Sequence, residues 1–258
     1  GPDELGLVLP QLQDETVWVG LTQPQQVAYQ RADRARSPLA QSSKREKACA
    51  FALGRSAKAE AAVATLVADP TLRKVVVFAE HLRHLSITER LLDAAGIGWV
   101  RIDGPRSKKE RAAALDRFKN DPTVRVLLAT RVLERGLDGL QHCGVLFSLG
   151  ASFNPAREAQ RIGRLRRPGS PHSQVRHVTF ATNTDHERAK HEALRRRRLE
   201  AVALIHGLSA TTTHKEIEML LSETQVQTLV RTRRWLPPLK TPYGSPLSEA
   251  VAAAEEME

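Results

Sequence analysis

The sequence is poor in the residues that stabilise secreted or metal-centred folds. Its 258 residues include only two cysteines, Cys49 and Cys143, which form no metal-binding spacing and no disulfide framework. Both stand among apolar neighbours, so we expect small buried side chains and a reducing, intracellular setting. No apolar run approaches the roughly 20 residues that a membrane span requires, and no secretory signal opens the chain. We therefore expect no membrane partner.

Negative charge is also scarce. The chain has 29 Asp and Glu against 39 Lys and Arg, so its net charge is 39 − 29 = +10. This excess favours a polyanionic partner, because each phosphate that Lys or Arg neutralises releases counterions. Many basic proteins never bind nucleic acid, and charge alone leaves both interpretations open. The hydrophobic content of 41% is enough to build a core, which argues against global disorder.

Two further absences concern nucleotide chemistry. The sequence contains no Gly-x-x-x-x-Gly-Lys-Ser/Thr phosphate loop and no Asp-Glu-x-His segment that could hold Mg²⁺. Without them nothing in these residues cradles the β- and γ-phosphates or places the metal. We expect no metal site here and negligible ATP hydrolysis by this polypeptide alone.

Short apolar runs alternate with segments of helical spacing between about residues 72 and 182. The alternation predicts an α/β fold, a parallel sheet of about five to six strands with helices on both faces. Ser107 and Glu110 form a capping box for one of these helices. Asn154 caps a later one, with Pro155 at its first position, and Pro168-Gly169 ends it. The expected strands span residues 74–79, 97–102, 124–129, 144–149 and 175–180.

The flanks of this region are less regular. Upstream we expect a strand over 14–20, a helix over 23–36, an exposed polar loop over 37–47 and an Ala-rich helix over 49–68. Downstream, Thr184 with Glu187 opens a very basic helix that reaches about residue 206, and Thr213 with Glu216 opens another.

The most informative stretch contains a glutamine, a glycine and several arginines. At 100° per residue, Gln160, Arg164 and Arg167 fall within an arc of about 60° on one helix face. Gly163 lets another surface approach that face closely. Two guanidiniums and a carboxamide there would bind phosphate oxygens, because Arg offers forked and permanently charged donors. The same residues also suit a solvated basic helix whose last arginines favour its C-terminal dipole, so the spacing by itself leaves both open.

A second segment strengthens the first interpretation. Residues 130–138, Thr-Arg-Val-Leu-Glu-Arg-Gly-Leu-Asp, leave the C-terminal end of the 124–129 strand, where open α/β sheets bind ligands. The order Thr-x-x-x-x-Arg-Gly-Leu-Asp, strand, Asn-Pro, Gln-x-x-Gly-Arg-x-x-Arg resembles motifs V and VI of superfamily 2 helicases. The strand at 75–78 resembles their motif IV. The resemblance covers about residues 9–182.

Two details place the resemblance within the superfamily. Phe153-Asn154-Pro155 followed by Glu158-Ala159-Gln160, and the opening residues 9–29, resemble the second lobe of Swi/Snf-type DNA translocases. By contrast, residues 134–138 lack the glycine-rich run of those proteins, and 168–170 reads Pro-Gly-Ser. Those two departures resemble DEAD-box and excision-repair helicases.

The resemblance implies a RecA-like C-terminal lobe and a role for each matching residue. Arg164 and Arg167 would be arginine fingers and Gln160 would position phosphates. The residues that would bind nucleotide are Gly136, Asp138 and Gly163. Those that would contact nucleic acid are Thr130, Arg131, His81, Arg195 and Arg196. Asp138 is alternatively a loop cap, and Thr130 is alternatively a strand-end hydroxyl whose hydrogen bond is satisfied by the backbone. His81 is otherwise an ordinary helix-start residue. The arginines at 195–198 would otherwise pack against a first RecA-like lobe or form a solvated face.

The implied organisation has four parts. Residues 1–70 lead into the lobe, 71–182 form the RecA-like domain, 183–236 a basic helical extension, and 237–258 a flexible tail. ATP and Mg²⁺ would be held mainly by a first RecA-like lobe, supplied by the same chain or a separate one. We expect double-stranded DNA as the nucleic-acid partner and a cytoplasmic location in a bacterial or phage-infected cell, or a nuclear one in a eukaryote.

The expected function is the second motor lobe of an ATP-dependent DNA helicase or translocase. A stand-alone nucleic-acid-binding or regulatory module derived from such a lobe is one alternative. Part of an RNA helicase is another.

Overall fold

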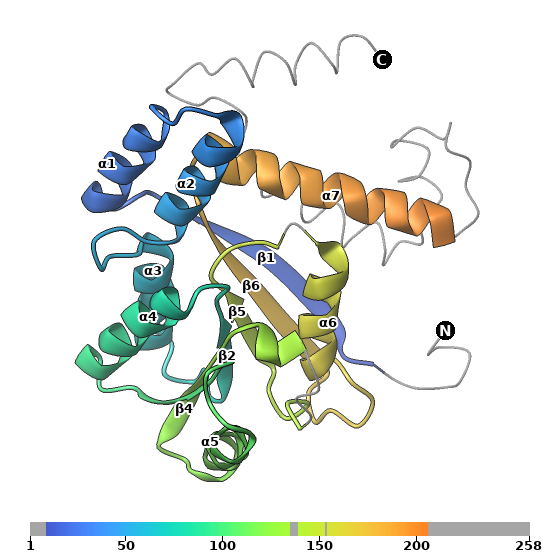
Figure 1. Ribbon diagram of the computed structural model, residues 1–258. Coiled ribbons are helices and arrows are strands. Elements are labelled where there is room, and N and C mark those ends of the chain that lie inside the picture. The colour runs from blue at the N-terminus through green and yellow to red at the C-terminus, as the bar shows by residue number, and fades with distance from the viewer. Residues whose placement is uncertain (1–8, 135–138, 153, 206–258) are drawn as a thin grey trace.

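A parallel sheet forms the centre of the computed structural model, which describes residues 9–134, 139–152 and 154–205 (Figure 1). Its strand order is β1-β6-β5-β2-β4-β3, and every neighbouring pair is parallel. This confirms the expected α/β fold. The strands are β1 (Gln11–Val19), β2 (Val75–Phe78), β3 (Gly98–Ile102), β4 (Val124–Ala129), β5 (Val145–Ser148) and β6 (Gln174–Thr182).

Helices cover both faces of the sheet. Alternate residues of a strand point to opposite faces, so β2 contributes to two separate cores. Val75 and Val77 pack among the buried residues of α3 and α4, whereas Val76 and Phe78 pack among those of α5 and α6. The helices are α1 (Gln23–Ala32), α2 (Pro38–Ala50), α3 (Ala57–Ala68), α4 (Leu82–Ala94), α5 (Lys108–Asn120), the 3₁₀ turn η2 (Arg131–Glu134), α6 (Pro155–Leu165) and α7 (Asp185–Ile205).

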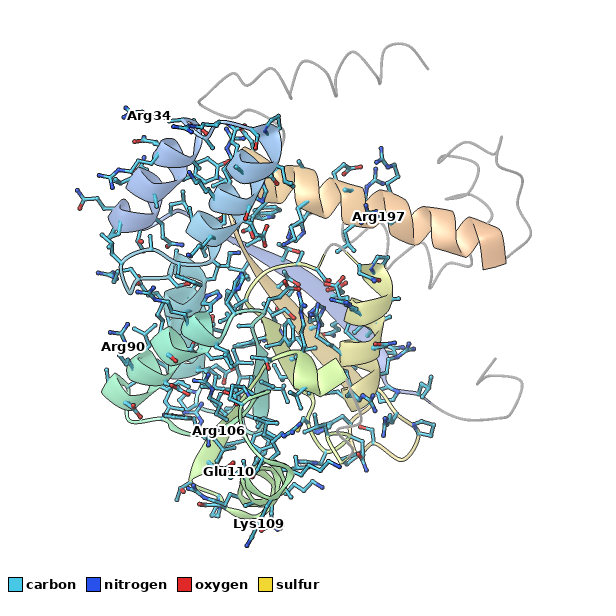
Figure 2. The ribbon with its side chains drawn as sticks, viewed as in Figure 1. Arg34, Arg90, Arg106, Lys109, Glu110 and Arg197 are labelled. Carbon is cyan, nitrogen blue, oxygen red and sulfur yellow. The ribbon has the colours of Figure 1, made fainter. Side chains whose placement is uncertain are left out.

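The N-terminal part differs from the expectation in two elements. The predicted exposed loop at 37–47 is wrong, because these residues belong to α2. The Ser37 hydroxyl accepts a hydrogen bond from the Ala40 N–H, and Pro38 occupies the first helical position. Both are ordinary helix-start signals that the polar composition of the segment obscured. The helices α1 and α2 together form a hairpin, and Arg34 at its end lies far from Lys109 on α5 (Figure 2).

The predicted continuous helix at 49–68 is also wrong. The chain becomes extended at Phe51, and α3 begins at Ala57. Gln25 stabilises this break. Its Nε2 donates to the Ala48 carbonyl at 2.9 Å and its Oε1 accepts from the Ala57 N–H at 2.8 Å. One fully buried amide therefore satisfies the end of α2 and the start of α3.

The start of α7 matches the predicted capping box only in part. The Glu187 N–H donates to the Thr184 hydroxyl at 3.3 Å, as expected. The Glu187 carboxylate instead accepts from the backbone N–H and the hydroxyl of Thr182. The predicted box at Thr213 and Glu216 and the expected tail at 237–258 lie outside the described residues.

Both cysteines are buried, as their apolar neighbours predicted. Burial raises the pKa of the Cys49 thiol to about 11 and that of Cys143 to about 12, so both are neutral thiols at ordinary pH. Among the described helices, none combines the length and apolarity needed to cross a bilayer.

Candidate nucleotide and nucleic-acid site

The parallel strands bring several predicted site residues to one edge of the sheet. Phe78 at the end of β2 pairs with Ala129 of β4 and with Ser148 of β5. Ile102 of β3 also pairs with Ala129. These four strands therefore end in line. Thr130 follows β4 and the N-terminus of α6 follows β5, so motifs V and VI both begin at this carboxyl edge.

Thr130 lies at this edge but is buried, with only 6% of its surface exposed. Its N–H donates to the Ile102 carbonyl at 3.3 Å, and its own carbonyl accepts from the Leu133 N–H at 2.9 Å, which begins η2. This geometry fixes the start of the motif V loop. Contact of Thr130 with nucleic acid stays a prediction.

Arg131 and His81 are the accessible side chains of this edge. The side chain of Arg131 is 54% exposed and lies 3.5 Å from the Glu80 carboxylate in an ion pair. His81 precedes α4, and its exposed ring meets Phe51 edge to face, with ring centres 5.8 Å apart. A cation and an imidazole, one following β4 and the other β2, thus face solvent where the strands end.

The start of α6 agrees with the prediction and its end does not. Asn154 Oδ1 accepts from the Ala156 N–H at 3.0 Å, and Pro155 is the first helical residue. The helix ends at Leu165 and not at Pro168. Arg166 leaves the helical conformation, with ψ at 81°, and its Nε donates to the Pro10 carbonyl at 2.6 Å. Because a proline disfavours the helical conformation of the residue before it, the helix ends short of Arg167, and Arg166 contacts a distant part of the chain.

This early end changes the arrangement of the three predicted catalytic residues. Gln160 and Arg164, four positions apart on α6, share one helix face; Gln160 is exposed and Arg164 half-buried. Arg167 lies beyond the helix, so helical spacing does not place it on that face, and this part of the prediction is wrong. Gly163 faces open space, since a Cβ there would have no atom within 4 Å. Gly136 and Asp138 lie outside the described residues.

Sequence reasoning missed the role of Arg161. This residue is fully buried, and its guanidinium lies 3.9 Å from the centre of the Phe78 ring. The contact joins the motif VI helix to the last residue of the motif IV strand. Its sequence signal is its spacing, because Arg161 stands four residues before the buried Leu165 and therefore on the buried face of α6. The charge of an arginine nevertheless favours a solvent-exposed position.

The sheet face that carries α6 is partly polar. His177 of β6 is fully buried; its Nε2 lies 2.9 Å from the Ser148 hydroxyl and its Nδ1 lies 2.9 Å from Asp14 Oδ1. The order Ser, His, carboxylate is that of a nucleophilic triad, but neither Ser148 nor His177 has exposed surface for a substrate. We interpret it as a structural relay across β5, β6 and β1.

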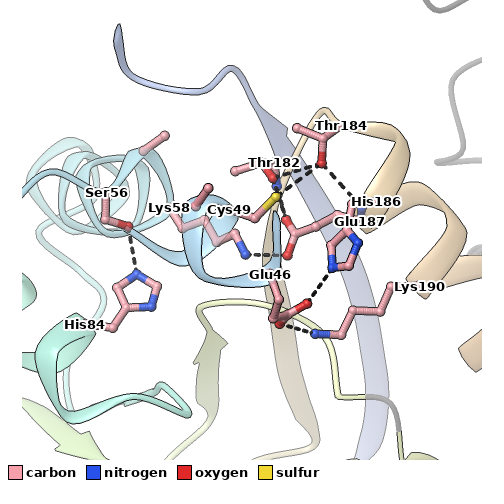
Figure 3. A network of polar contacts seen from close by, with 12 residues as sticks. Glu46, Cys49, Ser56, Lys58, His84, Thr182, Thr184, His186, Glu187 and Lys190 are labelled. Carbon is pink, nitrogen blue, oxygen red and sulfur yellow. Dashed lines mark hydrogen bonds and ion pairs between the residues drawn. The ribbon is translucent and has the colours of Figure 1, made fainter. Parts of the chain in front are cut away.

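A second polar network supports the loop between β5 and α6 (Figure 3). Lys58 of α3 and Glu187 of α7 form an ion pair in which the two side chains are 2% and 1% exposed. The Lys58 amine lies 3.2 Å from the place that a Cβ on Gly150 would occupy, and Gly150 has φ of +121°. Only glycine adopts this backbone readily. The network therefore lies against the loop that leads into motif VI, where a side chain at position 150 would meet the Lys58 amine.

The neighbouring carboxylate of Glu46 extends this network to α2. It accepts hydrogen bonds from Lys190 at 2.6 Å and from His186 at 2.9 Å. Burial would raise the pKa of Glu46, but the His186 hydrogen bond and the Lys190 charge outweigh it and lower the pKa to about 2. Glu46 is thus an anion that anchors α2 to α7.

The remaining predicted contacts lie on α7. Arg195 is bonded to Glu192 within the helix, with Nη2 and Oε1 2.9 Å apart, and Arg196 is exposed. Their proposed contact with nucleic acid stays a prediction. Among the described residues, no group of three or more His, Cys, Asp or Glu side chains is placed to hold a metal ion.

Comparison with known families agrees with this geometry. Residues 57–169 match the family model of the helicase conserved C-terminal domain. This part of the chain is therefore similar to a helicase C-terminal domain. Its fold is that of Swi2/Snf2 second lobes. The C-terminal part of the Fun30 ATPase domain superposes with a TM-score of 0.61 at 14% identity, covering 88% of this chain and 97% of that one. The Sulfolobus solfataricus SWI2/SNF2 ATPase C-terminal domain superposes with a TM-score of 0.57 at 15% identity, covering 85% of this chain and 98% of that one.

Sequence relatives come from several helicase groups. The XPB helicase/translocase subunit of general transcription and DNA repair factor IIH from Dictyostelium discoideum is 33% identical over 96 residues, which is 37% of this chain and 11% of that protein. The DNA repair protein rad8 of Schizosaccharomyces pombe is 35% identical over 98 residues, 37% of this chain and 8% of that protein. The ATP-dependent RNA helicase DBP3 of Meyerozyma guilliermondii is 33% identical over 116 residues, which is 45% of this chain and 20% of that protein. The matches thus span 8% to 20% of these relatives.

Proposed function

We propose that this chain is the second motor lobe of an ATP-dependent DNA translocase or helicase. The observation that carries the proposal is the convergence of two segments at one sheet edge. The motif V loop begins there at Thr130 and Arg131, and the motif VI helix, with Gln160 and Arg164 on one face, begins beside it. The printed names of two relatives, a helicase/translocase subunit and a DNA repair protein, support DNA as the substrate.

The described residues fit a triphosphate bound by a partner lobe. Arg164 and Arg167 are half-buried and therefore still accessible, and Gly163 leaves room for another molecule to approach α6. Bound ATP would supply the phosphoanhydride bond whose cleavage drives the motor. Arg164 and Arg167 would stabilise charge on the γ-phosphate, an effect worth about 10³–10⁵ in rate in comparable hydrolases. Gln160 would orient the phosphates, and Mg²⁺ would be placed by the first lobe.

The coupling to DNA would run through the sheet edge. Arg131 and His81 face solvent and would contact a phosphate, while Thr130 fixes the loop that leads from β4 to Asp138. The guanidinium of Arg161 on the Phe78 ring would keep α6 in register with the end of β2. A change at the nucleotide would then move the residues that contact DNA.

The test combines this chain with a first lobe that carries a phosphate loop and measures duplex-stimulated ATPase. Arg164→Ala should reduce turnover about 10³-fold or more and leave DNA affinity within about twofold. Arg157→Ala, on the first turn of the same helix, is the matched control and should retain turnover. ATP hydrolysis by this chain alone would contradict the proposal.

The same experiment separates the alternatives. Weaker DNA binding in proportion to slower turnover in Arg164→Ala would favour a stand-alone binding module. The relative named as an RNA helicase supports a second candidate, an RNA-dependent motor. Stimulation by duplex RNA and not by duplex DNA would establish that candidate instead.

A further inference from the structure

The hairpin of α1 and α2, residues 23–50, carries an excess of positive charge. It contains only two acidic residues, and both are neutralised. Asp33 is paired with Arg45 at 2.6 Å, and Glu46 is paired with Lys190. Its other basic side chains are exposed and form no ion pair within the described part of the chain. They are Arg31, Arg34, Arg36, Lys44 and Lys47. We call this element the basic hairpin.

The basic hairpin is a fixed support for these charges. Gln25 ties both helices to α3 through buried hydrogen bonds. The Tyr29 hydroxyl accepts a hydrogen bond from the His186 N–H at 3.3 Å, and the Arg45 guanidinium lies 5.3 Å from the centre of the Tyr29 ring. A held scaffold loses little backbone entropy on binding, so its cations are suited to a specific contact.

The neutral residues around the cations are also suited to phosphate. Gln26, Gln30, Ser42 and Ser43 are exposed on the same two helices. Side chains of Ser and Gln, together with Arg and Lys, make many of the protein contacts to phosphate oxygens and sugars. Exposed side chains of these kinds, with no unpaired carboxylate among them, are complementary to a nucleic-acid backbone.

The basic hairpin projects from the edge that holds the candidate site. It follows β1 directly, and Val19 at the end of β1 pairs with Thr182 at the end of β6. The hairpin therefore begins at the carboxyl edge, where Thr130 and Arg131 also lie, and Arg34 points away from the sheet (Figure 2). It lies outside the residues matched by the helicase family model, which begin at 57.

We propose that the basic hairpin is a second, sequence-independent binding site for the phosphate backbone of duplex DNA. The choice of duplex DNA rests on the proposed function, whereas the site itself rests on the charge and geometry of the hairpin. Contacts there would add affinity without reading bases, because the hairpin offers cations and hydroxyls to phosphates.

The test measures binding of the full chain to a duplex DNA as a function of salt. The variant Arg31→Gln/Arg34→Gln/Arg36→Gln/Lys44→Gln should bind about tenfold more weakly or worse at low salt. Its plot of log affinity against log salt concentration should flatten by about 0.9 for each phosphate that the hairpin no longer neutralises, so by about 3 for three phosphates. All four side chains are exposed, and the thermal midpoint should stay unchanged.

A matched control removes the same charge elsewhere. Arg73→Gln/Lys108→Gln/Lys109→Gln/Arg117→Gln changes four exposed cations away from the hairpin and should alter the salt slope far less. Equal weakening in both variants would mean that only net charge matters, and would overturn the proposal. So would a hairpin variant that binds duplex RNA more weakly but keeps its affinity for DNA. Because the binding measurement does not require ATP, it tests the hairpin even if the proposed motor function is wrong.

Discussion

The guanidinium of Arg161 lies over the ring of Phe78, 3.9 Å from its centre, and neither side chain reaches solvent. One residue belongs to the helix with the predicted arginine fingers and the other ends a central strand. A desolvated contact of this kind contributes about 2 kcal/mol. The contact therefore connects α6 to the end of β2, and the proposed mechanism depends on both segments.

Replacement of this arginine should destabilise the fold. Arg161→Ala should lower the free energy of unfolding by about 2 kcal/mol or more, because it removes the stacked cation and leaves a void beside Phe78. Urea denaturation measures the change. Arg157→Ala on the same helix, at a half-buried position, should cost about 0.5 kcal/mol or less. Equal stabilities of the two variants would show that the stack contributes nothing.

The buried pair of Lys58 and Glu187 should behave as a coupled unit. Lys58→Met leaves the Glu187 carboxylate buried without its cation, and breaking a buried pair in this way costs about 3–5 kcal/mol. Lys58→Met/Glu187→Gln should cost less than the sum of its single changes by about 1 kcal/mol or more. A double-mutant cycle from urea unfolding curves measures this coupling; simple additivity would contradict the pairing.

Gly163 offers a test that separates stability from function. Its Cβ position is open, so Gly163→Ala should stabilise α6 by about 1 kcal/mol through helix propensity. If another lobe or a nucleotide approaches this face, the added methyl group should nevertheless reduce ATPase in the reconstituted motor. A stabilised variant with full turnover would show that nothing approaches Gly163 closely.

Acid should weaken the attachment of α2 through Glu46. The folded-state pKa of Glu46 is lowered to about 2 from an ordinary value of 4.5. A depressed pKa contributes stability that is present above the unfolded value and disappears as pH falls through the folded one. Stability should therefore decline between about pH 4.5 and 2. Glu46→Gln should be less stable at neutral pH, by about 3 kcal/mol at most, and its stability should change less across that window.

A separate acid effect should come from His191. Burial lowers the pKa of this ring, which packs on Trp18, to about 4 from 6.5. Since the unfolded chain takes up the proton first, stability should already fall between about pH 6.5 and 4. His191→Phe should remove this dependence while retaining the ring contact. An unchanged slope in that window would contradict the assignment.

Much of the fold was predictable because local signals agreed with the final packing. The strands β2 and β4 are largely buried on both faces, and their apolar runs indicated this directly. The Asn154-Pro155 start of α6 was equally local. The partner of β1 was not predictable, because a strand that pairs with β6 more than 160 positions away leaves no trace in either segment.

One error arose where a distant residue contributes, since Gln25 of α1 bonds to both sides of the break between α2 and α3. The end of α6 has a local cause, because Pro168 disfavours the helical conformation of Arg167. The buried cations are a related case. Their charge assigns Arg161 and Lys58 to solvent, yet inside the fold each faces a partner, an aromatic ring for Arg161 and a carboxylate for Lys58. These partners are visible only once the chain is folded.

At the opposite rim of the sheet, two short turns enter β2 and β4 and take no part in the proposed chemistry. Each turn is closed locally. Thr71 is bonded to Asp69, and Thr123 to Asp121. Both threonines are exposed. A dye or surface tether attached at either turn would leave the working edge unobstructed, so single molecules of this lobe could be immobilised and followed while DNA and nucleotide come and go on the other side.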